Sequence, residues 1–245
     1  LARLEPCEIL VSDKLLQRGD ILETFEPWKD RLTSLPNSRF DSTNGNNRLQ
    51  NLFKVRTLDG FGQFTRGELA AGGALVDYIE LTQQGKLPRV APPRRLTNGE
   101  VLEIDQATRR NLELIVTPDG DRRGSLLSVI DRTQTGAGAR ELATRLSAPL
   151  TDPKKIDHRL DAVQHFTEDR ILRETLRDLL KQCPDLERAL SRLTLNRGGP
   201  RDLASIRDGL TLAGEVQNLL QAKQLPLVIG QAKKKLGNHK ILVEK

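Results

Sequence analysis

The spacing of apolar residues separates a mixed first part of the chain from a helical second part. Ile9-Leu10-Val11 is a short apolar run closed by Ser12-Asp13, which predicts a brief buried strand. Residues 33–47 are rich in turn formers and predict a loop, and a short helix is predicted over 48–53. Apolar positions then recur at helical spacing over 66–84.

The helix predicted over 66–84 contains two adjacent glycines, which are unfavourable inside a helix. Gly72-Gly73 weakens a helix by roughly 1 kcal/mol per glycine relative to alanine. We therefore expect another element to pack closely against this pair. Asp59-Gly60-Phe61-Gly62, just upstream of the helix, predicts a turn.

The pattern changes between residues 85 and 100. Gly85 followed by Pro88 predicts a helix end, and the proline-rich stretch 88–95 is typical of a connection between domains. We place the domain boundary here, with one domain over 1–90 and a second over 91–245. Val101–Ile104 predicts a brief strand at the start of the second domain.

Helical periodicity dominates after Asp105. Asp105 predicts an N-cap, and Asp152-Pro153 predicts an N-cap followed by proline at the first helical position. The stripe Ile156, Leu160 and Val163 predicts a helix face buried against other helices. The predicted helices are 106–115, 125–131, 138–146, one from Asp152-Pro153, one around 172–180, one opened by Pro184, one over about 200–220 and a last, lysine-bearing helix after Pro226.

Composition narrows the class of protein. Hydrophobic residues make up 37% and charged residues 29% of 245 positions, and no apolar run approaches the roughly 20 residues of a membrane span. No signal peptide is recognisable at the start. Aromatic residues are only 3%, which argues against a base-stacking platform for single-stranded nucleic acid. The chain holds no Met, so we expect it to be an internal piece of a longer protein.

The positive charge is concentrated at one end. The net charge is +6, and residues 223–245 carry +5 of it through six lysines and one glutamate. Such a cluster attracts phosphate or acidic surfaces, although a solvated helix face carries the same pattern. The two cysteines, Cys7 and Cys183, stand in no metal-binding motif and predict two buried reduced thiols, as in a cytoplasmic protein.

Motifs for catalysis are absent from the sequence. No phosphate-binding P-loop occurs, and Gly136-Ala137-Gly138 lacks the third glycine of a dinucleotide fingerprint, since Glu141 stands there. His158 and His165 are seven residues apart, whereas helical metal ligands are typically four apart. We therefore predict no catalytic, cofactor-binding or metal-ligating residue in this chain, and no enzymatic activity of its own.

Several collinear motifs resemble one family. Asp105–Leu114 (DQATRRNLEL) is similar to the segment that opens the core domain of the MutS family of DNA mismatch-repair proteins. Upstream, Leu1–Leu10 resembles a connector-domain segment, and Leu69–Tyr78 resembles its glycine-containing helix. The resemblance continues through Ser125–Thr133, Gly138–Leu142, Pro149-Leu150, Arg159–Val163, Asp185–Leu193 and Pro200–Leu203.

The resemblance implies a fold and a role. It implies an α+β chain: a partial RNase H-like α/β connector domain over 1–90, then the first part of an all-α helical core domain over 91–245. The whole protein would bind mismatched double-stranded DNA as a homodimer, use ATP and Mg²⁺ at a P-loop ATPase, contact a MutL-type partner through the connector, and lie in the cytoplasm, with no membrane association. None of the family's functional residues has a counterpart here, so this piece would be the structural relay between DNA-binding and ATPase parts.

Two other interpretations remain open. One is a MutS relative that does not recognise mismatches. The presence of the family's Phe-x-Glu motif upstream of Leu1 would exclude this interpretation. The other is a stand-alone helical interaction module without a role in nucleic-acid metabolism. A natural start just before Leu1 and a stop after Lys245 would favour that module.

Overall fold

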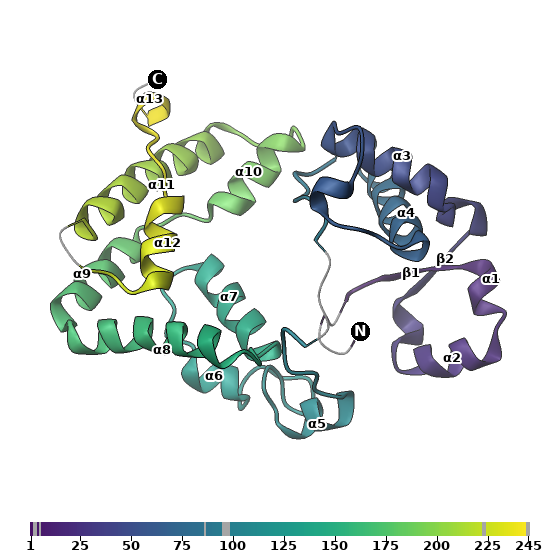
Figure 1. The fold of residues 1–245 in the computed structure, drawn as a ribbon, viewed down its shortest axis with the longest axis horizontal. Coiled ribbons are helices and arrows are strands. Elements are labelled where there is room, and N and C mark those ends of the chain that lie inside the picture. Colours follow the sequence, from purple (N-terminus) through teal and green to yellow (C-terminus); the bar gives the residue numbers. More distant parts are fainter. Residues whose placement is uncertain (2–3, 5, 86, 95–98, 222–223, 244–245) are drawn as a thin grey trace. The chain divides into compact units, whose positions relative to one another are not determined.

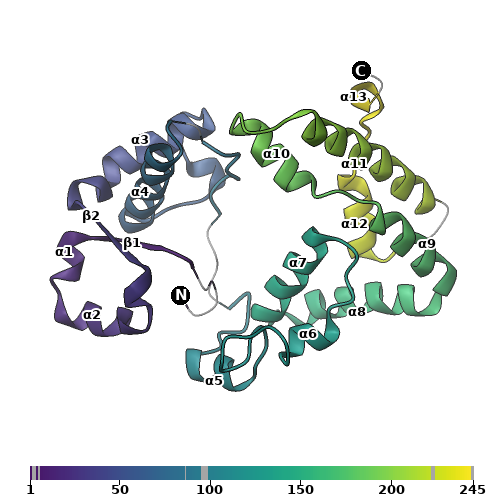
Figure 2. The same cartoon turned by 180° about the vertical axis from the view of Figure 1, so that it is seen from behind.

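The computed structural model of the chain describes residues 1, 4, 6–85, 87–94, 99–221 and 224–243. They form two compact units, which part between residues 96 and 97 (Figures 1 and 2). The first unit combines two short strands with helices, and the second is helical, so the predicted α+β fold class is confirmed. The elements of the first unit are β1 (Ile9–Ser12), α1 (Asp13–Leu16), α2 (Gly19–Phe25), η1 (Glu26–Arg31), β2 (Leu32–Leu35), η2 (Asn37–Phe40), α3 (Ser42–Phe53), η3 (Asp59–Phe61) and α4 (Arg66–Thr82), where η marks a 3₁₀-helix.

The second unit consists of helices joined by short connections. In its described part, β-pairing is limited to one antiparallel bridge between Val101 and Leu150, so the strand predicted over 101–104 is reduced to a single pair. Its elements are α5 (Gln106–Asn111), α6 (Leu126–Ile130), α7 (Gly136–Ser147), α8 (Pro153–Glu168), α9 (Arg170–Lys181), α10 (Leu186–Thr194), α11 (Pro200–Leu219), α12 (Leu227–Lys235) and α13 (Lys240–Val243).

The strand predicted at Ile9–Val11 is confirmed and pairs with one that the sequence did not indicate. β1 and β2 run parallel, with Ile9 opposite Leu32 and Ser12 opposite Leu35. Ser12 ends β1 and caps α1, because its Oγ accepts a hydrogen bond from the Leu15 N–H at 3.1 Å. Residues 13–31 form the crossover that a parallel pair requires.

The loop predicted over 33–47 is wrong. Its first residues belong to β2, and α3 begins at Ser42 rather than near Arg48. The Asp41 carboxylate caps α3 by accepting from the Asn44 N–H at 2.7 Å. Turn-forming residues enter the helix because α3 packs on α4, and packing overrides intrinsic propensity.

Close packing at the glycine pair is confirmed. A Cβ added to Gly73 of α4 would overlap the Gly45 Cα of α3, so the two helices meet backbone to backbone. At Gly72 an added Cβ would lie 3.3 Å from the Leu49 Cδ1. Leu49 joins Leu58 and Val76 in the buried core of this unit.

Asp77 of α4 closes the same interface with charge. It pairs with Arg39 and with Arg48, whose Nη2 lies 2.8 Å from the Asp77 Oδ1. Arg48 also donates from Nη1 to the Gly73 carbonyl at 3.1 Å. The helix predicted over 66–84 ends two residues early, at Thr82, and Gly85 follows with a positive φ of 78°.

Most helix starts of the second unit follow the capping rules. Side chains at the N-cap accept backbone N–H groups at Asp105, Ser125, Thr135, Asp152, Asp169 and Asp185. The helix predicted to open at Pro184 therefore begins two positions later, at Leu186. The helix predicted at Gly138 begins at Gly136, because Thr135 provides the cap.

One predicted helix is too long, and the last one is interrupted. The one over 106–115 stops at Asn111, and Glu113 takes a positive φ of 47°, which no helix continues. The last helix is divided into α12 and α13 at Gly237, whose φ is +68°. Both corrections fall where the backbone enters the left-handed region.

The buried face of α8 differs from the predicted one. Leu160 and Val163 are exposed, at 57% and 63%, whereas Ala162 and Phe166 pack against the core. That core is built from Leu172, Leu220 and Ile229, the buried residues contributed by α9, the end of α11 and α12. The positions of these neighbouring helices decide which side of α8 is covered. Among the described residues, no helix combines the length and apolarity that crossing a bilayer requires.

Candidate functional site

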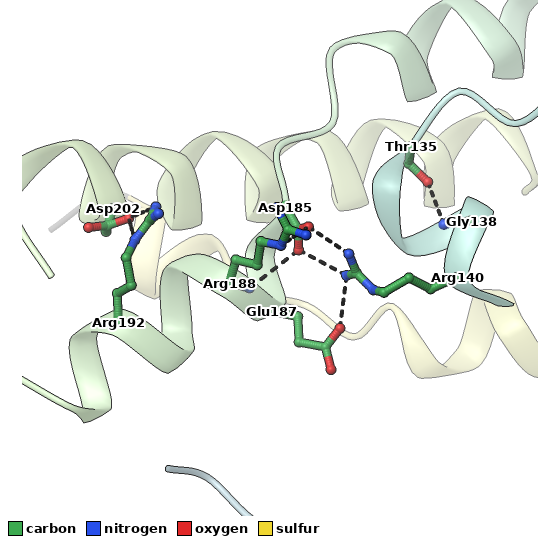
Figure 3. Close-up of polar contacts among 8 residues, drawn as sticks. All are labelled: Thr135, Gly138, Arg140, Asp185, Glu187, Arg188, Arg192 and Asp202. Atoms are coloured by element: carbon green, nitrogen blue, oxygen red, sulfur yellow. Dashed lines mark hydrogen bonds and ion pairs between the residues drawn. The ribbon is translucent and has the colours of Figure 1, made fainter. Parts of the chain in front are cut away.

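Charged side chains link three helices of the second unit near the start of α10 (Figure 3). Arg140 of α7 donates from Nη1 to the Asp185 Oδ2 at 2.9 Å and from Nη2 to the Asp185 Oδ1 at 3.1 Å. Its Nη2 also lies 2.9 Å from the Glu187 Oε2. This two-pronged contact holds α7 against the first turn of α10 with a defined orientation.

Asp185 serves two helices at once. Besides pairing with Arg140, its Oδ1 accepts the Arg188 backbone N–H at 3.3 Å and so caps α10. The Arg188 Nε lies 3.4 Å from the Asp185 Oδ2. Loss of this carboxylate would remove both the helix cap and the two-pronged contact with α7, and would leave Arg140 its contact with Glu187.

A second pair joins α10 to α11. The Arg192 Nε donates to the Asp202 Oδ1 at 2.8 Å, and Asp202 is only 7% exposed. The Asp202 Oδ2 accepts the Gly199 N–H at 3.0 Å, which fixes the first turn of α11. The two helices also approach closely farther along, because a Cβ at Gly209 would overlap the Leu186 side chain.

Both carboxylates are held in their charged form. Hydrogen bonding from Arg140 is the main cause that lowers the pKa of Asp185, and the Arg188 N–H adds to it. Hydrogen bonding from Arg192, followed by the Gly199 N–H, lowers the pKa of Asp202. These groups therefore act as fixed negative charges near neutral pH, a property suited to structure and not to proton transfer.

The histidines singled out from the sequence lie apart. The His158 Nδ1 is 3.9 Å from the Asp161 Oδ2, and His165 stacks edge-on to Phe166 with ring centroids 5.6 Å apart. The His239 Nε2 lies 3.0 Å from the Leu236 carbonyl oxygen, beside a groove between α11 and α13. Within the described ranges, no three His, Cys, Asp or Glu side chains gather closely enough to bind a metal ion.

The cysteines only partly match the prediction. Both are free thiols, but Cys7 is exposed instead of buried, since it lies just before β1 at the edge of the two-stranded sheet. Cys183 is half-buried, and that burial raises its thiol pKa. A raised pKa keeps a thiol protonated and unreactive.

The lysine cluster lies on the last turn of α12. Lys234 and Lys235 are exposed and Lys233 is half-buried, while Ile229 anchors the other side of the helix in the core. Cations at a helix C-terminus are favoured by the helix dipole. No carboxylate in the described part of the chain forms an ion pair with these three lysines, so their charge faces solvent.

Sequence reasoning did not find the Arg140 and Arg192 pairs. Their partners are 45 and 10 residues away in the sequence. Side chains that pair within one helix are three or four residues apart, so the spacing gives no sign of these contacts. One signal was present: Asp185 and Asp202 each stand within the first turn of a predictable helix, where a carboxylate is favoured. Which arginine meets each carboxylate follows only from the packing of the helices.

Comparison with known protein families identifies both parts of the chain. The profile of MutS domain II matches residues 1–91, and that of MutS domain III matches residues 107–243. The two matches follow each other in chain order. The second alone covers more than half of the chain.

Individual relatives match the whole chain. It is 45% identical over 245 residues to the DNA mismatch repair protein MutS of Roseobacter denitrificans and 49% identical over 244 residues to that of Cereibacter sphaeroides. The protein of the same name from Paracoccus denitrificans is 46% identical over 244 residues. Each alignment covers 100% of this chain but only 27–28% of the relative, so the chain spans little more than a quarter of their length.

Proposed function

This chain belongs to the MutS family, and we propose that it connects the DNA-binding and ATPase parts of a DNA mismatch-repair protein. Residues 1–90 would form the later part of the connector domain and residues 91–245 the first part of the helical core. The observation that carries this proposal is the consecutive match to MutS domains II and III over nearly the whole chain. The wider protein would bind mismatched duplex DNA as a homodimer, with ATP and Mg²⁺ bound outside these residues.

The internal contacts of each unit support a relay role. Transmission of a conformational change between distant sites needs stiff elements that have discrete arrangements. In a loosely packed scaffold the side chains would rearrange locally, and the change would not reach the second site. The α3–α4 contact at Gly45 and Gly73 and the Arg140–Asp185 and Arg192–Asp202 pairs make such elements. A MutL-type partner would dock on the connector.

The relay is tested by joining the two units covalently in the longer protein. Cys7 and Cys183 are first replaced by serine, and a pair of new cysteines then forms a disulfide between the units. We expect the oxidised protein to bind mismatched duplex but to release it no faster when ATP is added. Reduction should restore ATP-dependent release, and single-cysteine variants should behave normally. Unchanged release in the oxidised protein would contradict the relay.

A second experiment uses the 245-residue chain alone. It should bind mismatched and matched duplexes equally weakly, with affinity that falls steeply with salt, because binding would come from exposed lysines. Changing Lys233, Lys234 and Lys235 to glutamine should weaken binding more than changing Lys154 and Lys155 on the first turn of α8. A clear preference for mismatched DNA, or turnover of nucleotide by this chain, would contradict the proposed division of labour.

A further inference from the structure

Arg109 is buried, and two of its three guanidinium nitrogens have no acceptor. It is the single buried residue of α5, at 8% exposure, while the other five residues of that helix are exposed. Its Nε and Nη1 are both inaccessible, and neither has a hydrogen-bond partner within the described residues. The guanidinium is permanently charged and carries five N–H donors, so this position is strongly unfavourable as it stands.

The two carboxylates that cap this segment, at the start of α5 and at the end of α6, are engaged in other contacts. Asp105 caps α5 by accepting the Thr108 N–H at 2.9 Å. Asp131 accepts from Arg122 at 2.5 Å and from the Thr133 hydroxyl at 2.7 Å. Within the described residues, neither enclosed nitrogen of Arg109 meets a carboxylate, so the anion that a buried arginine requires is missing there.

The surface of the same segment includes several large apolar side chains. Large hydrophobic side chains are exposed along it, and the Leu126 N–H donates to the Glu113 carbonyl at 2.9 Å, which brings the ends of α5 and α6 together. An apolar surface beside an unsatisfied cation fits a protein segment that carries an acid among apolar residues. The exposed side chains are Leu102, Leu112, Leu126, Val129 and Ile130.

We propose that Arg109 forms a buried ion pair with an Asp or Glu carboxylate on a segment outside residues 1–245, which packs over α5 and α6. This inference rests on the proposed function, in which the chain is part of a longer protein, as its 27–28% coverage of the relatives suggests. An outside anion would reach the guanidinium at Nη2, the nitrogen that is not among the enclosed ones. A DNA phosphate fits less well than a carboxylate, because the exposed side chains of this segment include large apolar ones, which suit a packed protein segment better than a duplex backbone.

The test compares stability in two contexts. Arg109→Met, Arg109→Lys and the control Arg110→Met, at the exposed neighbour on α5, are made in the 245-residue chain and in the longer protein. Hydrogen exchange measures the thermal unfolding midpoint of the region around α5. In the longer protein we expect Arg109→Met to lower this midpoint by more than about 5 °C. In the 245-residue chain the same change should leave the midpoint unchanged or raise it, because it removes an unpaired buried charge. Arg110→Met should change neither.

Arg109→Lys keeps the comparison measurable where the methionine variant does not fold. Lysine retains the charge but loses the fork of donors, so it should destabilise the longer protein and leave the shorter chain unaffected. Equal destabilisation in both contexts would place the acceptor within this chain or in bound water and overturn the proposal. No effect in the longer protein would also overturn it.

A separate measurement tests whether a DNA phosphate is the anion that pairs with Arg109. A duplex that raises the midpoint of the 245-residue chain, but not of its Arg109→Met variant, would assign the anion to phosphate and overturn the carboxylate proposal. Failure of the longer protein to bind mismatched DNA would contradict the proposed function instead. The stability comparison at Arg109 does not depend on that binding, so the two failures are distinguishable.

Discussion

In the first unit α3 and α4 meet backbone to backbone at a pair of glycines, beside an Arg48–Asp77 ion pair, whereas in the second unit α7, α10 and α11 are joined chiefly by arginine–carboxylate pairs. The first kind of contact depends on the absence of atoms at Gly45 and Gly73, so a single added methyl group must move a helix. The second depends on charges at Asp185 and Asp202, which respond to pH and salt. The glycine contact and the charged contacts should therefore respond to different perturbations.

The largest effect is expected from Gly73→Ala. The new Cβ would overlap the Gly45 backbone, which cannot turn aside as a side chain can, so we expect a loss of about 3 kcal/mol in the free energy of unfolding. Gly67→Ala on the same helix is the matched control, because its Cβ meets nothing within 4 Å. Urea unfolding followed by circular dichroism measures both.

The equivalent change in the second unit sharpens this comparison. In Gly209→Ala the added Cβ meets the Leu186 side chain, which has rotamers available, and we expect a loss nearer 1 kcal/mol. A loss equal to or greater than that of Gly73→Ala would remove the proposed difference between the two units.

Removal of a single buried charge should come next. Asp202→Asn weakens the hydrogen bonds that this buried carboxylate accepts from the exposed Arg192 side chain and from the Gly199 N–H, so the unfolding midpoint in urea should fall. Asp208→Asn on the same helix removes an exposed carboxylate paired with its neighbour Arg207 and should shift the midpoint several-fold less. Equal shifts would indicate that burial of Asp202 contributes nothing.

Acid should weaken the second unit through its carboxylates. The folded pKa values of Asp185 and Asp202 lie below the ordinary value of about 3.9, so the unfolded chain binds more protons in this range. Their contribution is fully present above about pH 5 and is lost as the pH falls through about 4 toward the folded pKa values. Hydrogen exchange at pH 3, 4, 5 and 7 should show this loss in α10 and α11. The Asp185→Asn/Asp202→Asn double variant should lack it.

The smallest effect is expected at an exposed pair within one helix. Arg145 and Glu141 of α7 are four residues apart, with the Arg145 Nε 2.6 Å from the Glu141 Oε1. Glu141→Gln should lower the free energy of unfolding by only about 0.3–0.5 kcal/mol, because water screens the pair. Thermal unfolding at low and high salt checks this, and the difference should vanish at high salt.

The candidate site was only partly visible in the sequence. Asp185 stands at a recognisable helix start. No local pattern, however, marks Arg140 as the partner of Asp185 or Arg192 as the partner of Asp202. The exposed face of α8 shows the same limit, since Leu160 and Val163 have the periodicity of a core stripe and yet lie in solvent. Periodicity identifies a helix and its apolar side chains, while the neighbouring helices select which of them are covered.

The sequence alone determined the order of the two units, the positions of most helix starts, and the need for a close contact at Gly72-Gly73. Capping and glycine packing are encoded within a few residues, so local reading suffices for them. Only the tertiary structure decided that residues 32–35 form a strand, that Gly45 is the partner of Gly73, and that Arg109 is buried without an anion. Each of these depends on groups brought together from distant parts of the chain, which no pattern within a few residues records.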